Sequence, residues 1–130
     1  VWNETKGLGD YLALSSLLDS RFVVVLVGLT RKQIGKIRKE NSQIICIEKT
    51  NDADELAGIY SASDVFVNLT YEDTYPTVNL EAQACGTPCI TYATGGSVES
   101  VPAENIVPQG DLRGIVMAIK RVTDKNNIEV

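Results

Sequence analysis

The segment YEDTYPTVNLEAQACGTPCITYATGG, from Tyr71 to Gly96, carries the strongest structural signals of the chain. Pro76 suits the first position of a helix, because proline lacks the N–H group that would find no partner there. Gly86 suits the residue just beyond the end of that helix. The apolar run Cys89–Tyr92 predicts a strand, and Gly95-Gly96 follows it. The segment therefore predicts a helix, a buried strand and a glycine-bearing loop in succession.

The rest of the chain repeats this alternation. Phe22–Val27 reads FVVVLV, which is typical of a strand buried on both faces of a parallel sheet. Shorter apolar runs predict further strands at Gln43–Ile47, Val65–Asn68 and Cys89–Tyr92. Amphipathic stretches predict helices at Leu8–Leu18, Arg31–Lys39, Asp54–Ser61, Thr77–Cys85 and Asp111–Val122. Strands that alternate with helices of this length predict βαβ units and an α/β, Rossmann-like fold, in which helices flank a doubly wound parallel sheet.

Length and composition indicate one domain. We expect residues 1–122 to form it and 123–130 to be a polar tail, and because the chain does not begin with Met we expect it to be a fragment of a longer protein. The net charge of −5 argues against a nucleic-acid partner. The basic residues of 31–39 alternate with Ile34 and Ile37, as on a solvated helix face. No apolar run approaches the roughly 20 residues of a transmembrane helix.

Two features could suggest a metal site, but both have simpler interpretations. The sequence has no histidine, and its three cysteines sit among apolar neighbours, as expected of buried free thiols: Cys46, Cys85 and Cys89. Asp52-Ala53-Asp54 matches the DxD pattern of metal-dependent sugar transferases. However, Asp52 precedes a predicted helix and Glu55 follows three residues later, which is a capping arrangement. We therefore expect no metal site.

The candidate chemistry lies in loops at the carboxyl ends of the predicted strands, where ligands of open parallel sheets bind. At the predicted helix start, the free N–H groups of Thr77 and Val78 could hold a phosphate. Glu81 lies one turn further on, off the expected buried stripe of Val78, Ala82 and Cys85. Its carboxylate could therefore accept hydrogen bonds from both hydroxyls of a ribose. Asp73, seven residues before Glu81, could hold further hydroxyls.

Two other loops could contribute to an anion site. Lys6-Gly7 places an ammonium group in the first loop, near the predicted carboxyl edge of the sheet. Gly95-Gly96 permits positive φ and a close approach of backbone N–H groups to an anion. Together with the helix start and the two acids, these loops describe a pocket for a phosphorylated polyol.

This constellation resembles the C-terminal half of GT-B-fold, retaining glycosyltransferases of the group 1 family. The family signature is an acid, seven residues and a Glu-Ala pair, matched here by Asp73 and Glu81-Ala82. Several other segments match the family's order: Lys6-Gly7, Ile59–Thr70, Gly86-Thr87-Pro88 and Thr94-Gly95-Gly96. The wording EDTYPTVNLEA is similar to bacterial transferases that build capsular or surface polysaccharides.

The resemblance implies a domain that binds a nucleotide-diphosphate sugar and needs no metal or other cofactor. By position, Lys6 would neutralise the diphosphate, Glu81 would hold the ribose and Asp73 would hold the transferred sugar. The loop around Thr50 and Asn51 would meet the base. The full set of expected donor-binding residues is Lys6, Thr50, Asn51, Tyr75, Thr77, Val78, Glu81, Gly95 and Gly96, and the expected catalytic residues are Asp73 and Glu81.

The resemblance also implies what the rest of the protein does. A glycan or lipid-linked acceptor would bind through an N-terminal domain, so we expect the isolated domain to be inactive. The full-length enzyme would act in the cytoplasm, at the inner face of the membrane. The family usually has Glu where Asp73 stands, which leaves open whether Asp73 or Glu72 is the first acid. Two alternatives remain, a non-catalytic nucleotide-binding or interaction module and a nucleotide-sugar epimerase of the same fold.

Overall fold

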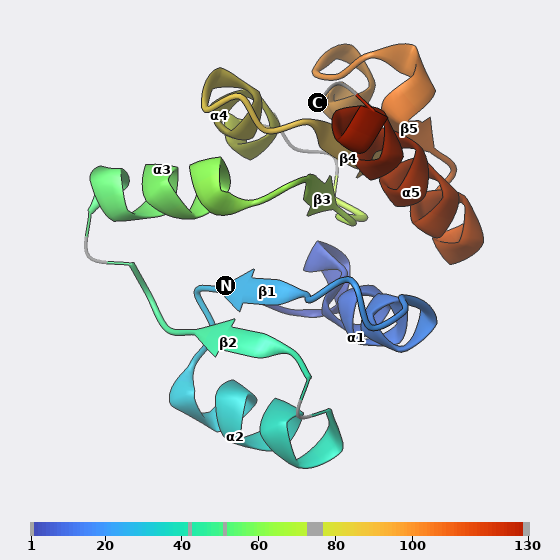
Figure 1. Cartoon of the computed structure of the whole chain (residues 1–130). Helices are drawn as coiled ribbons and strands as arrows, with labels where there is room; N and C mark the ends of the chain where they lie inside the picture. The colour runs from blue at the N-terminus through green and yellow to red at the C-terminus, as the bar shows by residue number, and fades with distance from the viewer. Residues whose placement is uncertain (1, 42, 51, 73–76, 129–130) are drawn as a thin grey trace.

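The computed structural model describes residues 2–41, 43–50, 52–72 and 77–128 (Figure 1). Its strands are β1 (Val25–Val27), β2 (Ile45–Ile47), β3 (Phe66–Asn68), β4 (Cys89–Tyr92) and β5 (Ile106–Val107). Its α-helices are α1 (Leu8–Leu17), α2 (Arg31–Glu40), α3 (Ala53–Ala62), α4 (Thr77–Ala84) and α5 (Leu112–Ile128). Short 3-10 helices are η1 (Glu4–Lys6), η2 (Gly95–Glu99) and η3 (Ala103–Asn105). No described helix has the length and apolar character needed to span a bilayer.

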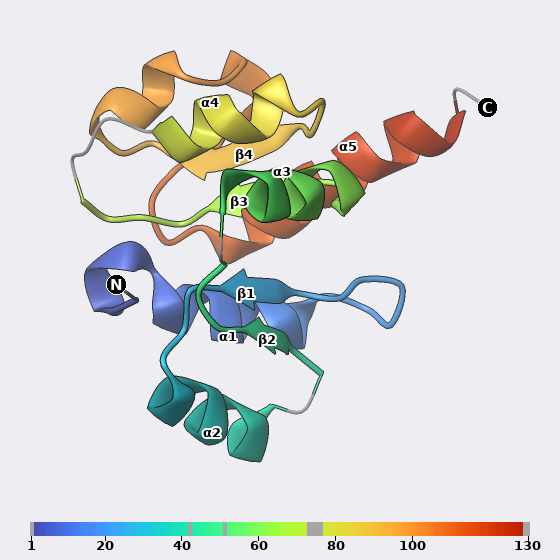
Figure 2. The same cartoon turned by 90° about the vertical axis from the view of Figure 1, so that its left-hand side faces the viewer.

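The predicted α/β fold, with parallel strands flanked by helices, is confirmed. All strand pairs of the described residues are parallel, but they form two sheets, β1–β2 and β3–β4–β5, rather than one. Figure 2 shows the first sheet with α1 and α2, and the second with α3 and α4. Strand β5 was not predicted, because two apolar residues are too few for a recognisable run. Helix α5 continues to Ile128, beyond the predicted end at Val122.

A tyrosine of α1 lies where the two sheets approach each other. The hydroxyl of Tyr11 donates to the carbonyl of Val67 at 2.5 Å and accepts from the N–H of Leu69 at 3.1 Å. It thereby bonds backbone groups on the side of β3 that faces away from β4, and burial raises the pKa of the phenol. Towards the first sheet, the indole of Trp2 donates to the carbonyl of Val27 in β1 at 2.7 Å, and its ring packs edge-on against that of Tyr11. These aromatic side chains connect the sheets where no strand pairing does.

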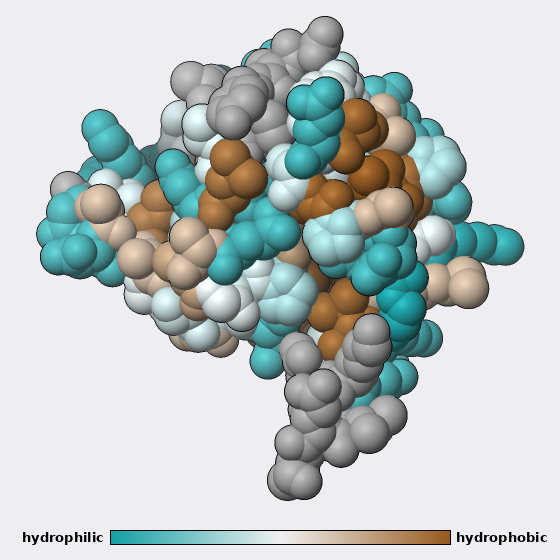
Figure 3. Space-filling view, turned by 90° about the horizontal axis from the view of Figure 1, so that it is seen from above, coloured by the Kyte–Doolittle hydropathy of each residue, from teal (hydrophilic) through white to brown (hydrophobic). Residues whose placement is uncertain are grey.

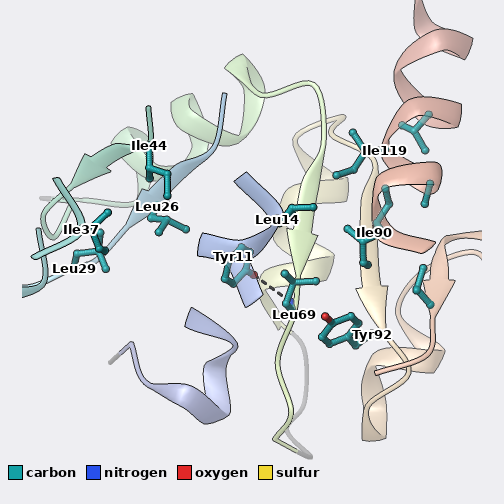
Figure 4. Packing of buried hydrophobic residues seen from close by; sticks show 14 of the residues in the cluster. Tyr11, Leu14, Leu26, Leu29, Ile37, Ile44, Leu69, Ile90, Tyr92 and Ile119 are labelled. Carbon is teal, nitrogen blue, oxygen red and sulfur yellow. Dashed lines mark hydrogen bonds between the residues drawn. The ribbon is translucent and has the colours of Figure 1, made fainter. Parts of the chain in front are cut away.

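One hydrophobic core spans both sheets. Figure 4 shows Tyr11, Leu14 and Leu69 between side chains of the first sheet and its flanking helix, such as Leu26 and Ile37, and side chains beyond β3. Those further side chains come from β4 and α5 and include Ile90, Tyr92, Ile115 and Ile119. Because the cluster is continuous, the two sheets belong to one packed domain.

The predictions for α2 and for the DxD motif agree with the structure. Ile34 and Ile37 are buried, whereas the Lys and Arg side chains of α2 are exposed. The carboxylate of Asp52 accepts from the N–H of Glu55 at 2.8 Å and so caps α3. No group of three or more His, Cys, Asp or Glu side chains in the described ranges could hold a metal ion. The three cysteines are free as expected, but only Cys89 is buried, whereas Cys46 and Cys85 are half-buried. Burial raises the pKa of the Cys89 thiol to about 12.

The predicted buried stripe of α4 is wrong at its first position and incomplete at its last, since Ala82 is buried but Cys85 is only half-buried and lies just beyond the end of the helix. Val78 is 39 % exposed, whereas Asn79 is wholly buried. The side chain of Asn79 accepts from Asn68 Nδ2 at 2.8 Å and donates to the Ser100 hydroxyl at 3.1 Å. A buried amide is favourable only when it is hydrogen-bonded. These partners therefore turn Asn79 inward and leave Val78 at the surface.

Gly7 permits the close contact between the start of α1 and the chain that follows β3. Its φ is 84°, in the left-handed region that favours glycine. A Cβ atom built on Gly7 would lie 2.1 Å from the carbonyl oxygen of Leu69. No side chain can occupy that space without moving the backbone.

Gly7→Ala should therefore lower the free energy of unfolding by about 2 kcal/mol or more, because strain at positive φ adds to the clash with Leu69. Gly35→Ala is the matched control. Gly35 lies inside α2 with nothing within 4 Å of an added Cβ, so alanine should stabilise the domain by up to about 1 kcal/mol. Urea denaturation of both variants measures this; equal effects would contradict the close approach at Gly7.

Candidate functional site

The first loop of the chain lies against the loop that follows β3. The N–H of Tyr71 donates to the carbonyl of Thr5 at 2.8 Å. The Lys6 ammonium forms an ion pair with Glu72, with 2.7 Å between Nζ and Oε2, and the Thr5 hydroxyl donates to the other oxygen of Glu72 at 2.5 Å. Lys6 thus lies beside the start of the signature segment.

The ion pair bears on the choice between the two candidate acids. Hydrogen bonds from Lys6 and from Thr5 hold the pKa of Glu72 below its ordinary value. Glu72 therefore carries a charge that Lys6 already balances, with about a third of its side chain exposed. Asp73 and three other predicted residues lie outside the described residues: Asn51, Tyr75 and Pro76.

Helix α4 begins at Thr77, as predicted, and exposes the residues expected to meet a ligand. Thr77, Val78 and Glu81 are all exposed at its first turns. Thr77 and Glu81, four residues apart, share one side of the helix. The Glu81 carboxylate lies near Tyr60, whose pKa is raised to about 12, mainly by burial and secondarily by that charge. On the buried side of the helix, the hydrogen bonds of Asn79 to Asn68 and Ser100 hold it in place.

The glycine-bearing loop after β4 is connected to the loops after β3 and β5. The buried hydroxyl of Thr94 donates to the carbonyl of Thr70 at 2.8 Å and accepts from Gln109 Nε2 at 2.7 Å. Gly95, at φ 43°, then opens η2, with Gly96 next to it. Sequence reasoning did not identify Gln109, because nothing around it marks the strand β5 that positions it.

Sequence reasoning also missed a cluster around Asp10. The hydroxyls of Tyr71 and Tyr92 both donate to Asp10 Oδ2, the latter at 2.7 Å. The two rings pack together with centroids 5.3 Å apart. The Asp10 carboxylate is the main cause of the raised pKa of Tyr71, while burial and then Asp10 raise that of Tyr92. An acid in the first turn of a helix usually signals only a favourable dipole interaction, so the sequence gives no sign of this role.

Other surface features lie apart from these loops. One hollow, of about 280 Å³, is lined by α1 and α2, and another, of about 410 Å³, is lined mainly by α2 and β2; none of the predicted donor-binding residues lines either. Thr50 is half-buried, and within the described ranges no hydrogen bond or ion pair joins it to the three loops. Figure 3 shows the face seen from above, where polar groups divide the hydrophobic surface into small patches.

The family model described as "Glycosyl transferases group 1" matches residues 2–125. The chain belongs to this family. Its curated relatives include D-inositol 3-phosphate glycosyltransferases. That of Corynebacterium jeikeium is 46% identical over 43 residues, which are 33% of this chain and 10% of the relative. That of Catenulispora acidiphila is 35% identical over 60 residues, or 46% of this chain and 14% of the relative.

Solved structures of glycosyltransferases share the fold over almost the whole chain. Sucrose-phosphate synthase from Thermosynechococcus elongatus is 26% identical, with a TM-score of 0.78 over 96% of this chain and 35% of its own. Anabaena Alr3699/HepE in complex with UDP-glucose is 16% identical, with a TM-score of 0.80 over 97% of this chain and 38% of its own. The chain therefore has the fold of a GT-B C-terminal domain and spans little more than a third of these structures.

Removing the Lys6 ammonium should raise the pKa of Glu72 towards its ordinary value, because Lys6 is the main cause of the lowering, while the hydrogen bond from Thr5 remains. Carboxyl NMR titration of Lys6→Met measures this shift, and Lys49→Met, which alters an exposed lysine elsewhere, should leave it unchanged. Since the pKa is lowered on folding, the pair stabilises the domain above the unfolded pKa. That contribution disappears as pH falls through the folded pKa. A Glu72 titration that is identical with and without Lys6 would contradict the ion pair.

Proposed function

We propose that the chain is the donor-binding domain of a retaining glycosyltransferase. The full-length enzyme would transfer a sugar from a nucleotide-diphosphate sugar to a glycan or lipid-linked acceptor in polysaccharide biosynthesis. The family match across residues 2–125 carries the proposal. The local geometry supports it, since the loop after β3 is bonded both to the Lys6 loop and to the glycine loop.

The proposed roles follow from the charges and donors of these elements. Lys6 meets the diphosphate, which replaces the carboxylate of Glu72 as its partner. The N–H groups of Thr77 and Val78 bind a phosphate at the start of α4, where the helix dipole favours an anion. Glu81 binds the ribose, and Asp73 the transferred sugar. Charge neutralisation at Lys6 and α4 favours departure of the nucleoside diphosphate, on which negative charge develops in the transition state.

The remaining predicted residues complete the donor site. Thr50 and Asn51 meet the base, while Tyr75, Gly95 and Gly96 contact the phosphates and the sugar. The UDP-glucose bound to Alr3699/HepE supports a uridine nucleotide as the first donor to test. No metal is needed in this proposal, and the isolated domain is inactive because acceptor contacts come from an N-terminal domain. The full-length enzyme acts in the cytoplasm, at the inner face of the membrane.

Calorimetric titration of the chain with UDP-, GDP- and ADP-glucose tests the proposal. We expect binding of at least one donor without added metal. Glu81→Ala should abolish that binding, because the ribose loses a bidentate, charge-assisted acceptor. Asp54→Ala is the control, since Asp54 is exposed in the first turn of α3 and should leave affinity nearly unchanged.

Two results would contradict the proposal. If the folded chain bound none of the three donors, the proposal of a donor site would be wrong. Binding that requires Mn²⁺ and is lost in Asp54→Ala would instead favour a metal-dependent site at the DxD motif.

A further inference from the structure

We propose that Asp10 is a positioning residue of the donor site, whose carboxylate holds the loops after β3 and β4 against the first turn of α1. This inference rests on the proposed function, because the donor site is itself a proposal. Asp10 is not among the residues that the family resemblance implies, and none of the predicted ligand contacts involves it.

The geometry connects three segments through one atom. Asp10 Oδ2 accepts the hydroxyl protons of Tyr71 and Tyr92, residues that are 61 and 82 positions away in the sequence. Each of the three lies next to or near a predicted donor residue. Asp10 lies in the first turn of α1, four residues after Lys6 at the end of η1. Tyr71 precedes Glu72 and the signature acid Asp73, and Tyr92 ends β4 just before the glycine loop.

The three side chains form a fixed unit. Tyr92 is wholly buried, and the Tyr71 ring packs against it at an interplanar angle of 58°. Gly110 also lies close to this unit, since a Cβ built there would be 3.6 Å from the Tyr71 hydroxyl. Hydrogen bonds to an ionised carboxylate are stronger than those between neutral groups. One half-buried acid can therefore set the position of two loop ends at once.

Other hydrogen bonds hold the backbone of these loops, such as that of the Tyr71 N–H to Thr5 and that of the Thr94 hydroxyl to Thr70, whereas Asp10 holds the side chains of Tyr71 and Tyr92. Tyr71 is 40 % exposed, and Glu72 beyond it is held by Thr5 and Lys6 of the first loop. Without Asp10, the Tyr71 hydroxyl loses its acceptor and the chain leading to Glu72 loses a fixed point. Because small displacements of binding groups cost much affinity, the donor site should weaken although Asp10 does not touch the ligand.

A second interpretation is that Asp10 serves only the dipole of α1, where an acid in the first turn is favourable. The two interpretations predict different behaviour for Asp10→Asn. The amide oxygen of asparagine still accepts hydrogen bonds from the tyrosines, but it carries no charge. A dipole role would make Asp10→Asn resemble Asp10→Ala, whereas a positioning role would make it resemble the wild type.

The experiment titrates UDP, GDP and ADP into the wild-type chain and into Asp10→Ala, Asp10→Asn and Asp64→Ala, after circular dichroism has shown that each is folded. For the nucleotide that the wild type binds, Asp10→Ala should raise Kd about tenfold. Asp10→Asn should stay within about threefold of the wild type. Asp64→Ala, an exposed acid before the amino end of β3, should leave Kd unchanged. Tyr71→Phe, which removes only one hydroxyl, replaces Asp10→Ala if that variant does not fold.

A second measurement does not depend on ligand binding. In Asp10→Ala, carboxyl NMR should show the pKa of Glu72 moving up towards its ordinary value, because the displaced loop withdraws Glu72 from Lys6. Unchanged Kd and an unchanged Glu72 titration in the folded variant would overturn the inference, as would equal losses in Asp10→Asn and Asp10→Ala. A wild-type chain that binds none of the nucleotides overturns the proposed function instead, and the Glu72 titration then decides whether Asp10 holds the loops.

Discussion

The hydroxyl of Tyr11 is the contact on which the arrangement of this domain depends. It bonds to the carbonyl of Val67 and the N–H of Leu69, on the side of β3 that faces away from β4. If these backbone groups were buried without partners, the lost hydrogen bonds would destabilise the fold. Helix α1 must therefore pack against β3 when the core forms. That position in turn brings Gly7 onto the Leu69 carbonyl, a contact that a larger residue would prevent.

The same helix turn connects the core to the candidate site. Tyr11 points inward to β3, while its neighbour Asp10 accepts the hydroxyls of Tyr71 and Tyr92 at the carboxyl ends of β3 and β4. Lys6 and Thr5, just before this turn, hold Glu72. The geometry of the loops is thus a consequence of how α1 packs. A ligand that binds Lys6 would therefore be connected to the hydrophobic core through the polar contacts at the start of α1.

The sequence was sufficient for the order of α1 to α5 and of β1 to β4, because their apolar runs and amphipathic stretches are long enough to recognise, but not for the two-residue strand β5. It also placed Lys6 near the loop after β3, since loops at strand carboxyl ends meet at one edge. It could not show that Asn79 rather than Val78 turns inward, because that depends on Asn68 and Ser100, which are distant in sequence. The contacts of Tyr11 with the backbone next to β3 and those of Asp10 with Tyr71 and Tyr92 are likewise long-range hydrogen bonds of single hydroxyl groups.

We propose that a nucleotide sugar binds where α1, β3, β4 and α4 bring their loop ends together. Amide NMR of the isotope-labelled chain during titration with UDP-glucose tests this most directly. Binding at this place should give the largest shift changes in residues 5–7, 77–81 and 94–97, with α2 and β2 nearly unchanged. Shift changes concentrated in α2 and β2, around the hollow that they line, would contradict it.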